Sequence, residues 1–403
     1  MSPISAEMKR RSTLINRLYR TVLMPIRSWK FRLYPTRVQS QEMQDHLRLS
    51  KNLWNEMLEL TKDTYATYGK FSTANALNEL AKTSGLYSQV AQDVFRRLNK
   101  SIVGMMARRK KGLKAGFPRF RNMERTKSLT YPQFGFSLKG KKLKAGPFGE
   151  INIRLHRQVI GNIKTLTLKR EASGRWYAIL TAEEKPRPAA VNNGSRVGID
   201  LGLANFAVLS DGSIIRNPKH LGRYEKLLKK KQQDLSIKKK GGRNREKAKH
   251  GLAVVHEKVR NSRKDFLHKL SRQLVNAHSL IALEDLNSAN MSKQNYGKSI
   301  NDAGWGEFAN MLSYKAESAG SRVVFVNPAG TTKKCSSCGG TVNKELWERK
   351  HNCPFCGLSI DRDLNAARNI LARATGGTPG SNACGDVSIG MSVKQDASRF
   401  SAG

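Results

Sequence analysis

The first half of the chain carries hydrophobic residues in two periods, one helical and one alternating. Residues 26–34, IRSWKFRLY, predict a strand that Pro35 ends. Apolar residues at helical spacing then predict helices, at residues 36–68, 73–82 and 88–107. Alternation replaces this period at residues 128–138, 150–155, 164–170 and 175–182. Together with the first strand, the alternating stretches predict a small β-barrel interrupted by a helical segment.

The second half begins after EEKPRPAAVNNGS, residues 183–195, whose composition is typical of a linker. Three apolar runs follow at residues 197–201, 206–209 and 213–215, and the turn Asp211-Gly212 between the last two predicts a hairpin. Residues 219–277 then predict a helical hairpin broken near Gly241-Gly242. The remaining predicted elements are strands at 280–283 and 323–326, and helices at 305–316 and from 363.

Charge narrows the class of partner. The chain has 73 Lys and Arg against 31 Asp and Glu, a net charge of +42. Self-repulsion on this scale destabilises a folded protein unless a polyanion neutralises it, and nucleic acid is the obvious polyanion. A membrane is the competing partner, but no apolar run reaches the roughly 18 to 20 residues that span a bilayer. The first 26 residues lack the features of a secretory signal, so we expect a cytoplasmic protein.

Two segments concentrate the positive charge. Residues 219–250 hold 13 Lys or Arg against 3 acids, which favours a helical hairpin lying along a nucleic-acid duplex; a plain solvated hairpin is the alternative. The run RRKKGLKAGFPRFR, residues 108–121, interleaves cations with Gly, Pro and two Phe, as suits phosphate contacts and base stacking. A solvated helix face remains the alternative for the polar groups before it. The candidate nucleic-acid contacts are Gln92, Arg96, Arg97, Arg108, Arg109, Lys110, Lys111, Arg119 and Arg121.

Three acids occupy unusual positions in the predicted elements. Asp200 lies inside an apolar strand, Glu284 ends another, and Asp363 begins a helix. A metal cation can compensate such buried charge. The alternatives are an Asp200 bonded to loop amides and an Asp363 that only caps its helix. Acids on two strands and a helix start can converge at one edge of an RNase H-like sheet, and phosphodiester hydrolysis by two divalent cations needs such a cluster.

Four of the five cysteines form the pattern C-x2-C-x14-C-x2-C. This spacing, with a Gly after each pair, predicts two knuckle turns and a closed, structural zinc site in a reducing compartment. A redox pair or an iron–sulfur cluster is the alternative. The predicted zinc ligands are Cys335, Cys338, Cys353 and Cys356. His351 is unnecessary as a ligand, and Cys384 lies in a tail for which we expect no chemistry.

The motifs VGIDLG, ALEDLN, CSSCG, CPFCG and DRDLNAARNI occur in this order along the chain. Over about residues 26–372, which also contain FRLYPT, GFPRFR and SINDAGWGEF, the chain resembles the TnpB (OrfB) proteins of bacterial insertion sequences, relatives of type V CRISPR effectors. The resemblance implies an α/β multidomain fold. Its expected parts are a basic extension at 1–25, a wedge-like β-barrel at 26–186 with recognition helices at about 37–125, a linker at 187–195, a RuvC-like (RNase H-like) nuclease domain at 196–372 with a basic helical hairpin at about 219–278 and a zinc-ribbon insertion at about 330–358, and a disordered tail at 373–403.

The resemblance also implies an activity. Such proteins bind a guide RNA made from the transposon end and cleave matching double-stranded DNA beside a short motif. We expect a monomer with its RNA, and an oligomer is the alternative. Carried over to this sequence, the catalytic Mg2+ ligands are Asp200, Glu284 and Asp363, with Asp361 as a neighbour. Open alternatives are a nuclease-inactive RNA-guided DNA binder or repressor, a compact type V CRISPR effector, and a DNA transposase or unguided nuclease.

Overall fold

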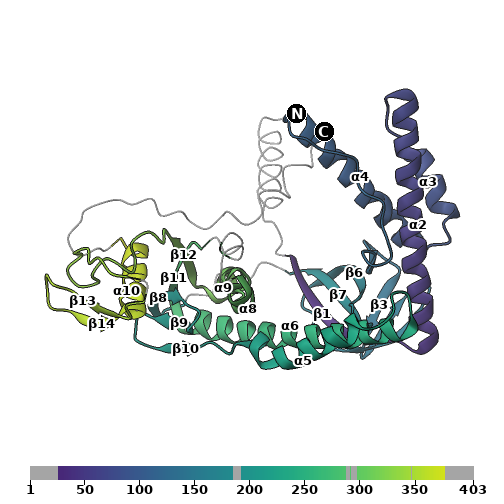
Figure 1. Cartoon of the computed structure of the whole chain (residues 1–403). Coiled ribbons are helices and arrows are strands. Elements are labelled where there is room, and N and C mark those ends of the chain that lie inside the picture. The colour runs from purple at the N-terminus through teal and green to yellow at the C-terminus, as the bar shows by residue number, and fades with distance from the viewer. Residues whose placement is uncertain (1–25, 185–191, 287–290, 292–296, 346, 377–403) are drawn as a thin grey trace, which may run out of the picture. The chain divides into compact units, whose positions relative to one another are not determined.

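The computed structural model describes residues 26–184, 192–286, 291, 297–345 and 347–376. The chain forms two compact units that divide between Pro186 and Arg187 (Figure 1). The extension expected at 1–25, most of the linker expected at 187–195, and the tail beyond residue 376 with Cys384 lie outside the described residues. In the part of the chain that is described, no helix is both long enough and apolar enough to cross a membrane.

The first unit is built on a seven-stranded antiparallel sheet in the order β2-β6-β7-β1-β5-β4-β3. Alternate residues of the central strand, among them Phe31 and Leu33, are fully buried in one apolar core. The strands are β1 (Ile26–Tyr34), β2 (Ser128–Tyr131), β3 (Phe136–Lys139), β4 (Lys142–Ala145), β5 (Gly149–Arg154), β6 (Asn162–Arg170) and β7 (Trp176–Glu183).

The outer strands β2 and β3 contribute side chains to the same core. The Tyr131 ring lies 6.3 Å from that of Phe136, and its hydroxyl donates to the Gly146 carbonyl. The sheet therefore curls around its core. Among the described residues, no hydrogen-bonded ladder joins β2 to β3, so the structure records a curled sheet and leaves the expected barrel closure as a prediction.

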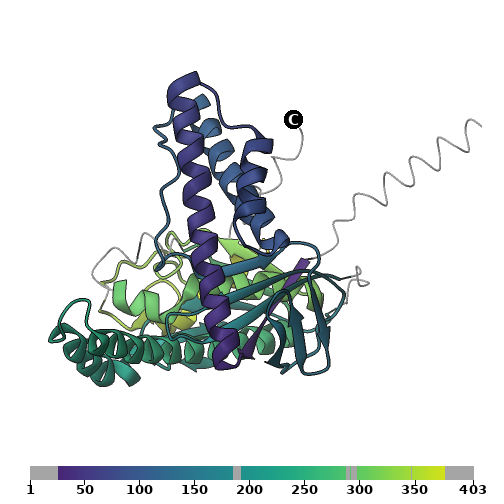
Figure 2. The ribbon, with the colours of Figure 1, turned by 90° about the vertical axis from the view of Figure 1, so that its right-hand side faces the viewer.

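Three helices pack together beside this sheet (Figure 2): α2 (Arg37–Tyr68), α3 (Ala74–Thr83) and α4 (Ser88–Lys110). Thr36 begins α2 with a capping box: the Thr36 hydroxyl accepts from the Gln39 backbone amide at 3.2 Å, and the Gln39 side-chain oxygen accepts from the Thr36 backbone amide at 3.0 Å. The helices share a second apolar core that includes Trp54, Met57 and Leu98. The three helices predicted from periodicity are confirmed, and α4 runs three residues further than predicted.

The prediction of one strand over residues 128–138 was wrong. The structure has two strands there, β2 and β3, separated by Pro132 to Gly135. Pro132 cannot donate to a ladder, and Gly135 has a φ of +88°, which turns the chain. The short strand β4 was overlooked because its residues, KLKA, alternate over only four positions, too few to signal a strand.

The second unit is built on a five-stranded sheet in the order β10-β9-β8-β11-β12. Its strands are β8 (Ser195–Leu201), β9 (Asn205–Leu209), β10 (Ile214–Arg216), β11 (His278–Glu284) and β12 (Arg322–Val326). Strands β8, β9 and β10 are antiparallel neighbours, whereas β8, β11 and β12 run parallel. The predicted hairpin is confirmed: Gly212 has a φ of +94°, and the Leu209 amide donates to the Ser213 carbonyl at 2.9 Å.

Helices cover both faces of this sheet. On one face, α6 (Arg243–Ala277) and α9 (Trp305–Ala319) share a core with Ile199, Ile281 and Leu283. On the other, α10 (Arg362–Ala374) packs its Ile370 against Ala282. The two sets of contacts involve alternate strand residues, which point to opposite faces of a sheet.

The predicted helical hairpin is confirmed, with α5 (His220–Ser236) and α6 joined by a turn in which Gly241 has a φ of +82°. Leu228 of α5 and Val255 and Val259 of α6 form its buried seam. Short elements that periodicity did not predict are α8 (Gly297–Ala303), β13 (Lys350–Asn352) and β14 (Ser359–Asp361).

Candidate functional site

Two of the three predicted acids lie side by side at the ends of neighbouring parallel strands. The β8–β11 register pairs Ile199 with Leu283, so the next residues along the two strands are Asp200 and Glu284. Ile199 and Leu283 both belong to the core beneath α6 and α9. Because successive strand residues alternate in direction, Asp200 and Glu284 point to the opposite face, on which α10 lies.

A glycine allows α10 to approach this face closely. A Cβ on Gly198 would lie 2.1 Å from the Ala367 carbonyl oxygen and 2.7 Å from the Leu371 amide nitrogen. No other residue fits there without moving the helix. Gly198 precedes Asp200 by two residues and shares its face, while Asp363 lies one helical turn before Ala367. The close contact therefore brings the start of α10, with Asp363, toward Asp200.

The start of α10 separates the roles of its two aspartates. The Asp361 carboxylate accepts from the amides of Asp363 and Leu364 at 2.8 and 3.1 Å, so Asp361 is the residue that caps the helix. The alternative in which Asp363 only caps its helix does not hold, because Asp361 accepts these hydrogen bonds. Instead, the Asp363 carboxylate accepts from two nitrogens of the Arg362 guanidinium, both at 3.1 Å.

The acids perturb one another electrostatically. Burial, followed by the negative charges of Glu284 and Asp363, raises the pKa of Asp200 to about 8, against an opposing effect of Arg362. Burial also raises the pKa of Glu284, although a hydrogen bond from the Thr331 hydroxyl, at 2.5 Å, lowers it. In the protein alone the cluster therefore resists full ionisation. A divalent cation supplies the charge that would reverse these shifts.

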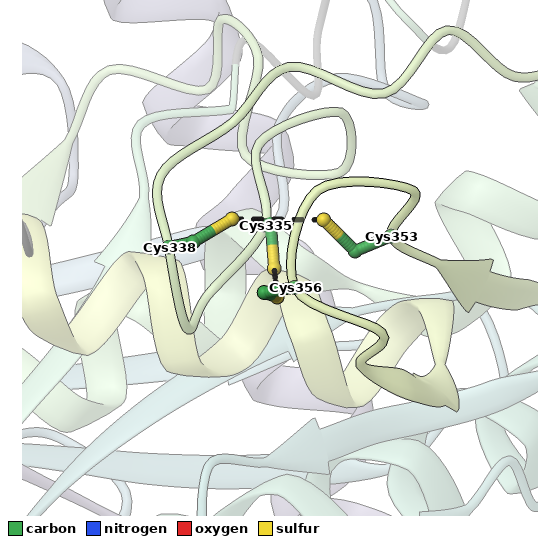
Figure 3. A group of neighbouring side chains, drawn as sticks. All are labelled: Cys335, Cys338, Cys353 and Cys356. Carbon is green, nitrogen blue, oxygen red and sulfur yellow. Dashed lines mark hydrogen bonds between the residues drawn. The ribbon is translucent and has the colours of Figure 1, made fainter.

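The four predicted cysteines form a second cluster (Figure 3), and their sulfurs all lie within 4.8 Å of one another. The pairs Cys335–Cys356 and Cys338–Cys353 are each 3.6 Å apart. Sulfurs bound tetrahedrally at about 2.3 Å from a zinc ion lie about 3.8 Å apart, so the geometry fits a four-thiolate metal site. Within the described residues, only the cysteines bring three or more ligand atoms this close together.

Matching turns build the cysteine cluster. In each turn, the backbone amide of the first cysteine donates to the carbonyl five residues later. Cys335 donates to Gly340 and Cys353 donates to Leu358, both at 2.8 Å. Gly339 and Gly357 follow the second cysteines with φ values of +78° and +74°. The predicted knuckle turns are confirmed, and glycine follows each pair because the turn needs the left-handed region. His351 is buried outside this group of ligands, with its Nδ1 2.6 Å from Lys344 Nζ.

The candidate nucleic-acid contacts fall into two groups. Arg97 pairs with Asp93 at 2.7 Å, Arg109 donates to the Ala115 carbonyl at 2.7 Å, and the Arg121 guanidinium lies 3.4 Å from the centre of the Trp54 ring. These three cations have intramolecular partners. The others are exposed: Gln92, Arg96, Arg108, Lys110, Lys111 and Arg119.

Sequence reasoning missed several residues around the acids. Gly198 was quoted within VGIDLG without a role, although a glycine inside an apolar strand signals a close backbone approach. Arg362 and Thr331, the partners of Asp363 and Glu284, gave no signal at all. A threonine 47 residues away in the chain cannot be paired with a glutamate by spacing.

Comparison with known proteins places the chain among its relatives. Residues 178–295, with Asp200 and Glu284, match the OrfB_IS605 family, described as "Probable transposase". Residues 305–370, with the cysteines and Asp363, match "Cas12f1-like, TNB domain". The chain is 34% identical over 392 residues to a "Putative RNA-guided DNA endonuclease" of Streptomyces pristinaespiralis, covering 93% of this chain and 94% of that protein. This chain belongs to the TnpB (OrfB) family.

Another TnpB-family relative, InsQ of Escherichia coli (strain K12), carries the same description and is 30% identical over 402 residues, covering 92% of this chain and 97% of that protein. Residues 24–70 match a family described as "Helix-turn-helix domain"; the described part of this range, residues 26–70, contains β1 and α2. A solved Cas12f1–sgRNA–target DNA complex is 16% identical, with 86% of this chain and 99% of that chain covered and a TM-score of 0.33.

Proposed function

We propose that this protein is an RNA-guided DNA endonuclease of a transposable element. It binds a guide RNA derived from the transposon end and cleaves complementary double-stranded DNA beside a short flanking motif. Membership of the TnpB family and the names of the relatives support the activity. The net charge of +42 supports a polyanionic partner.

A guide RNA divides the work of recognition. Side chains of one chain cannot read a long DNA sequence, whereas base pairing can, which leaves the protein to bind backbone, shape and a short duplex motif. The exposed cations of α4 and the following loop, and those of the α5–α6 hairpin, are the surfaces we assign to the nucleic acids. Their affinity should fall steeply with salt.

We assign the five-stranded sheet to a RuvC-type, RNase H-like nuclease domain. Its strand order, numbered along the chain from β8, is 3-2-1-4-5 with the second strand antiparallel to its neighbours, as in RNase H-like nucleases. We assign the curled seven-stranded sheet to a wedge-like barrel, and α2, α3 and α4 to its recognition helices.

The observation that carries the assignment of catalysis is the meeting of Asp200, Glu284 and Asp363 on the α10 face of this sheet. Their oxygens are hard ligands, as Mg2+ requires. Among the described residues, these acids do not form a close group of ligand atoms like that of the cysteines. Asp200, Glu284 and Asp363 would hold a pair of Mg2+ ions, whose ligands can be spread more widely than those of a single ion.

The residues of the chain have distinct roles in this site. Asp200 and Glu284 present carboxylates from rigid strand ends, and Gly198 lets α10 bring Asp363 to them. Arg362 orients the Asp363 carboxylate. Mg2+ ions held by these carboxylates would activate the attacking water and stabilise the leaving oxygen.

We assign the cysteine cluster to a structural zinc site. Four thiolates complete a tetrahedral shell and leave no open position for a substrate. The ligands Cys335, Cys338, Cys353 and Cys356 belong to the segment that matches the Cas12f1-like TNB domain. Metal analysis should find one zinc per chain, and iron or no metal in folded protein would contradict the assignment.

The test of the function uses the purified protein with its co-purifying RNA. That RNA is sequenced, and the complex is incubated with Mg2+ and plasmids that carry the guide-matched sequence beside a randomised flank. We expect RNA from the transposon end, and cut plasmids enriched in one flanking motif. Cutting without a guide match would contradict RNA guidance. Guided binding without cutting would favour the nuclease-inactive repressor.

A further inference from the structure

One face of α10 binds the chain segment 327–336, to which no role has been assigned above. Asn365, Asn369 and Arg373 are spaced four residues apart, so they lie on one side of the helix. All three direct their side chains to the backbone of residues 327–336, the stretch between β12 and the first cysteine knuckle. Asn365 and Asn369 are buried, with exposures of 0% and 6%.

Six hydrogen bonds, two from each side chain, join this face to that segment. Asn365 donates to the Lys334 carbonyl at 2.7 Å and accepts from the Ser336 amide at 2.9 Å. Asn369 donates to the carbonyls of Thr331 and Lys334 at 2.8 and 2.7 Å. Arg373 donates to the carbonyls of residues 327 and 329, at 2.6 and 2.9 Å. The segment is therefore fixed to the same helix that carries Asp363.

Thr331 links the fixed segment to the acids. Its side chain is 2% exposed, and its hydroxyl lies 2.5 Å from Glu284 Oε1 and 3.1 Å from the Pro328 carbonyl. A hydroxyl has one proton to donate. An ionised carboxylate at the shorter distance is the stronger acceptor, so the proton goes to Glu284. If Thr331 only stabilised its turn, a hydrogen bond from its hydroxyl to the Pro328 carbonyl would be enough.

We propose that Thr331 is a positioning residue that fixes the Glu284 carboxylate, and that Asn369 holds Thr331 in place on α10. Cys335 belongs to the same segment, so the cysteine knuckle is built into the scaffold of the acidic site. The proposal rests on the proposed nuclease function for its effect on cleavage. Its effect on cation binding can be measured separately.

The test compares Thr331→Val, which removes the hydroxyl at constant shape, with Thr331→Ser, which keeps it. The matched control is Thr332→Val, the same change one residue along. In the full chain with its RNA, we expect Thr331→Val to lower the cleavage kcat about 10- to 100-fold, as loss of a ligand's hydrogen-bond partner does. The Kd for target DNA and the melting temperature should stay near those of Thr332→Val, and Thr331→Ser should recover most of the rate.

A second readout does not depend on cleavage. Binding of Mn2+, as a paramagnetic probe ion followed by electron paramagnetic resonance, should weaken about 10- to 100-fold in Thr331→Val and little in Thr331→Ser. If the wild type does not cleave but this difference appears, the positioning role stands and the nuclease function fails. Equal Mn2+ affinity in wild type and Thr331→Val would overturn the proposal. So would equal impairment of the Val and Ser variants.

The part played by Asn369 is tested by a double-mutant cycle. If Asn369 acts on the acids through Thr331, then Asn369→Ala should weaken Mn2+ binding less in the Thr331→Val background than in the wild type. Full additivity of the two effects would overturn this part of the proposal.

Discussion

The cysteine cluster and the acidic cluster lie in the same unit and differ in completeness. The cysteine sulfurs pair at 3.6 Å, and each knuckle closes its own backbone hydrogen bonds. The acids are held by elements far apart in the chain, and burial, followed by repulsion from Glu284 and Asp363, raises the pKa of Asp200 to about 8. One site is formed by its turns, whereas the other is formed by the whole sheet and is electrostatically unsatisfied in the protein alone, which agrees with the cation-binding role that we propose for it.

This difference is what a structural site and a catalytic site require. A closed thiolate shell stabilises a fold and excludes substrate. A cluster of hard, partly buried oxygens binds a cation that still has positions for water and a phosphate oxygen. Substitutions in the first cluster should therefore act on stability, and substitutions in the second on chemistry.

The largest effect on stability should come from Cys335→Ser. Binding of structural zinc contributes on the order of 10 kcal/mol in small zinc domains, so loss of one thiolate should remove the metal and lower the melting temperature and folded yield. Zinc content and thermal denaturation measure this, with Cys384→Ser as the matched control. Normal stability and zinc content in Cys335→Ser would contradict a four-thiolate site.

Next in size is Gly198→Ala, which tests how the acidic site is assembled. The new Cβ would lie 2.1 Å from the Ala367 carbonyl oxygen, so α10 must move. Overpacking of this kind costs about 1–3 kcal/mol, and cleavage should fall while guided DNA binding persists. Gly251→Ala is the control, because its Cβ would meet only the Lys231 Cδ at 3.9 Å. Unchanged cleavage by Gly198→Ala would show that the approach of α10 is not required.

A smaller effect concerns pH in the absence of divalent cations. The pKa of Asp200 is raised from 3.8 to about 8 in the folded protein, so between these values the folded state binds more protons than the unfolded state. The stability contributed by this group is therefore lost as pH rises toward 8. In EDTA, wild type should lose melting temperature from pH 5 to pH 8 relative to Asp200→Asn. Mg2+ should restore the melting temperature at pH 8 in wild type but not in Asp200→Asn. If the melting temperatures of the two proteins change with pH in parallel, the raised pKa of Asp200 is contradicted.

The smallest effect should come from Asp361→Ala. Loss of this helix cap should cost about 0.5–2 kcal/mol because the amides of Asp363 and Leu364 lose their acceptor. Thermal denaturation measures the cost. An unchanged melting temperature would mean that Asp361 does not stabilise the start of α10.

Elements with a long, regular period were predictable from sequence. The periodicity predicts a strand at residues 26–34 and the long helices after it, and β1, α2, α3 and α4 agree. The turns predicted at Asp211-Gly212 and Gly241-Gly242 are also present in the structure. Both were predictable because Gly212 and Gly241 have positive φ values, which favour glycine. The exceptions are short elements such as β4, whose four residues are too few to establish a period.

The metal-ligand candidates were predictable for different reasons. Cysteine spacing alone encodes a site made by two turns, so the cluster followed from the motif. Asp200 and Glu284 could be named as misfits in apolar strands and Asp363 by its place at a helix start, but their partners could not be named. Thr331 and Arg362 act through contacts that only the folded sheet creates, and the choice of Asp361 as the helix cap depends on backbone angles.

The most direct test of the central claim compares two aspartates at the start of one helix. Asp363→Ala and Asp361→Ala remove the same charge two residues apart, and the complexes with co-purified RNA are assayed for binding and cleavage of matched DNA in Mg2+. We expect Asp363→Ala to bind DNA like wild type and to lose cleavage on the order of a thousandfold, as when a transition-state stabiliser is removed. Asp361→Ala should retain substantial cleavage. Full cleavage by Asp363→Ala would contradict the assignment of Asp200, Glu284 and Asp363 as the catalytic site.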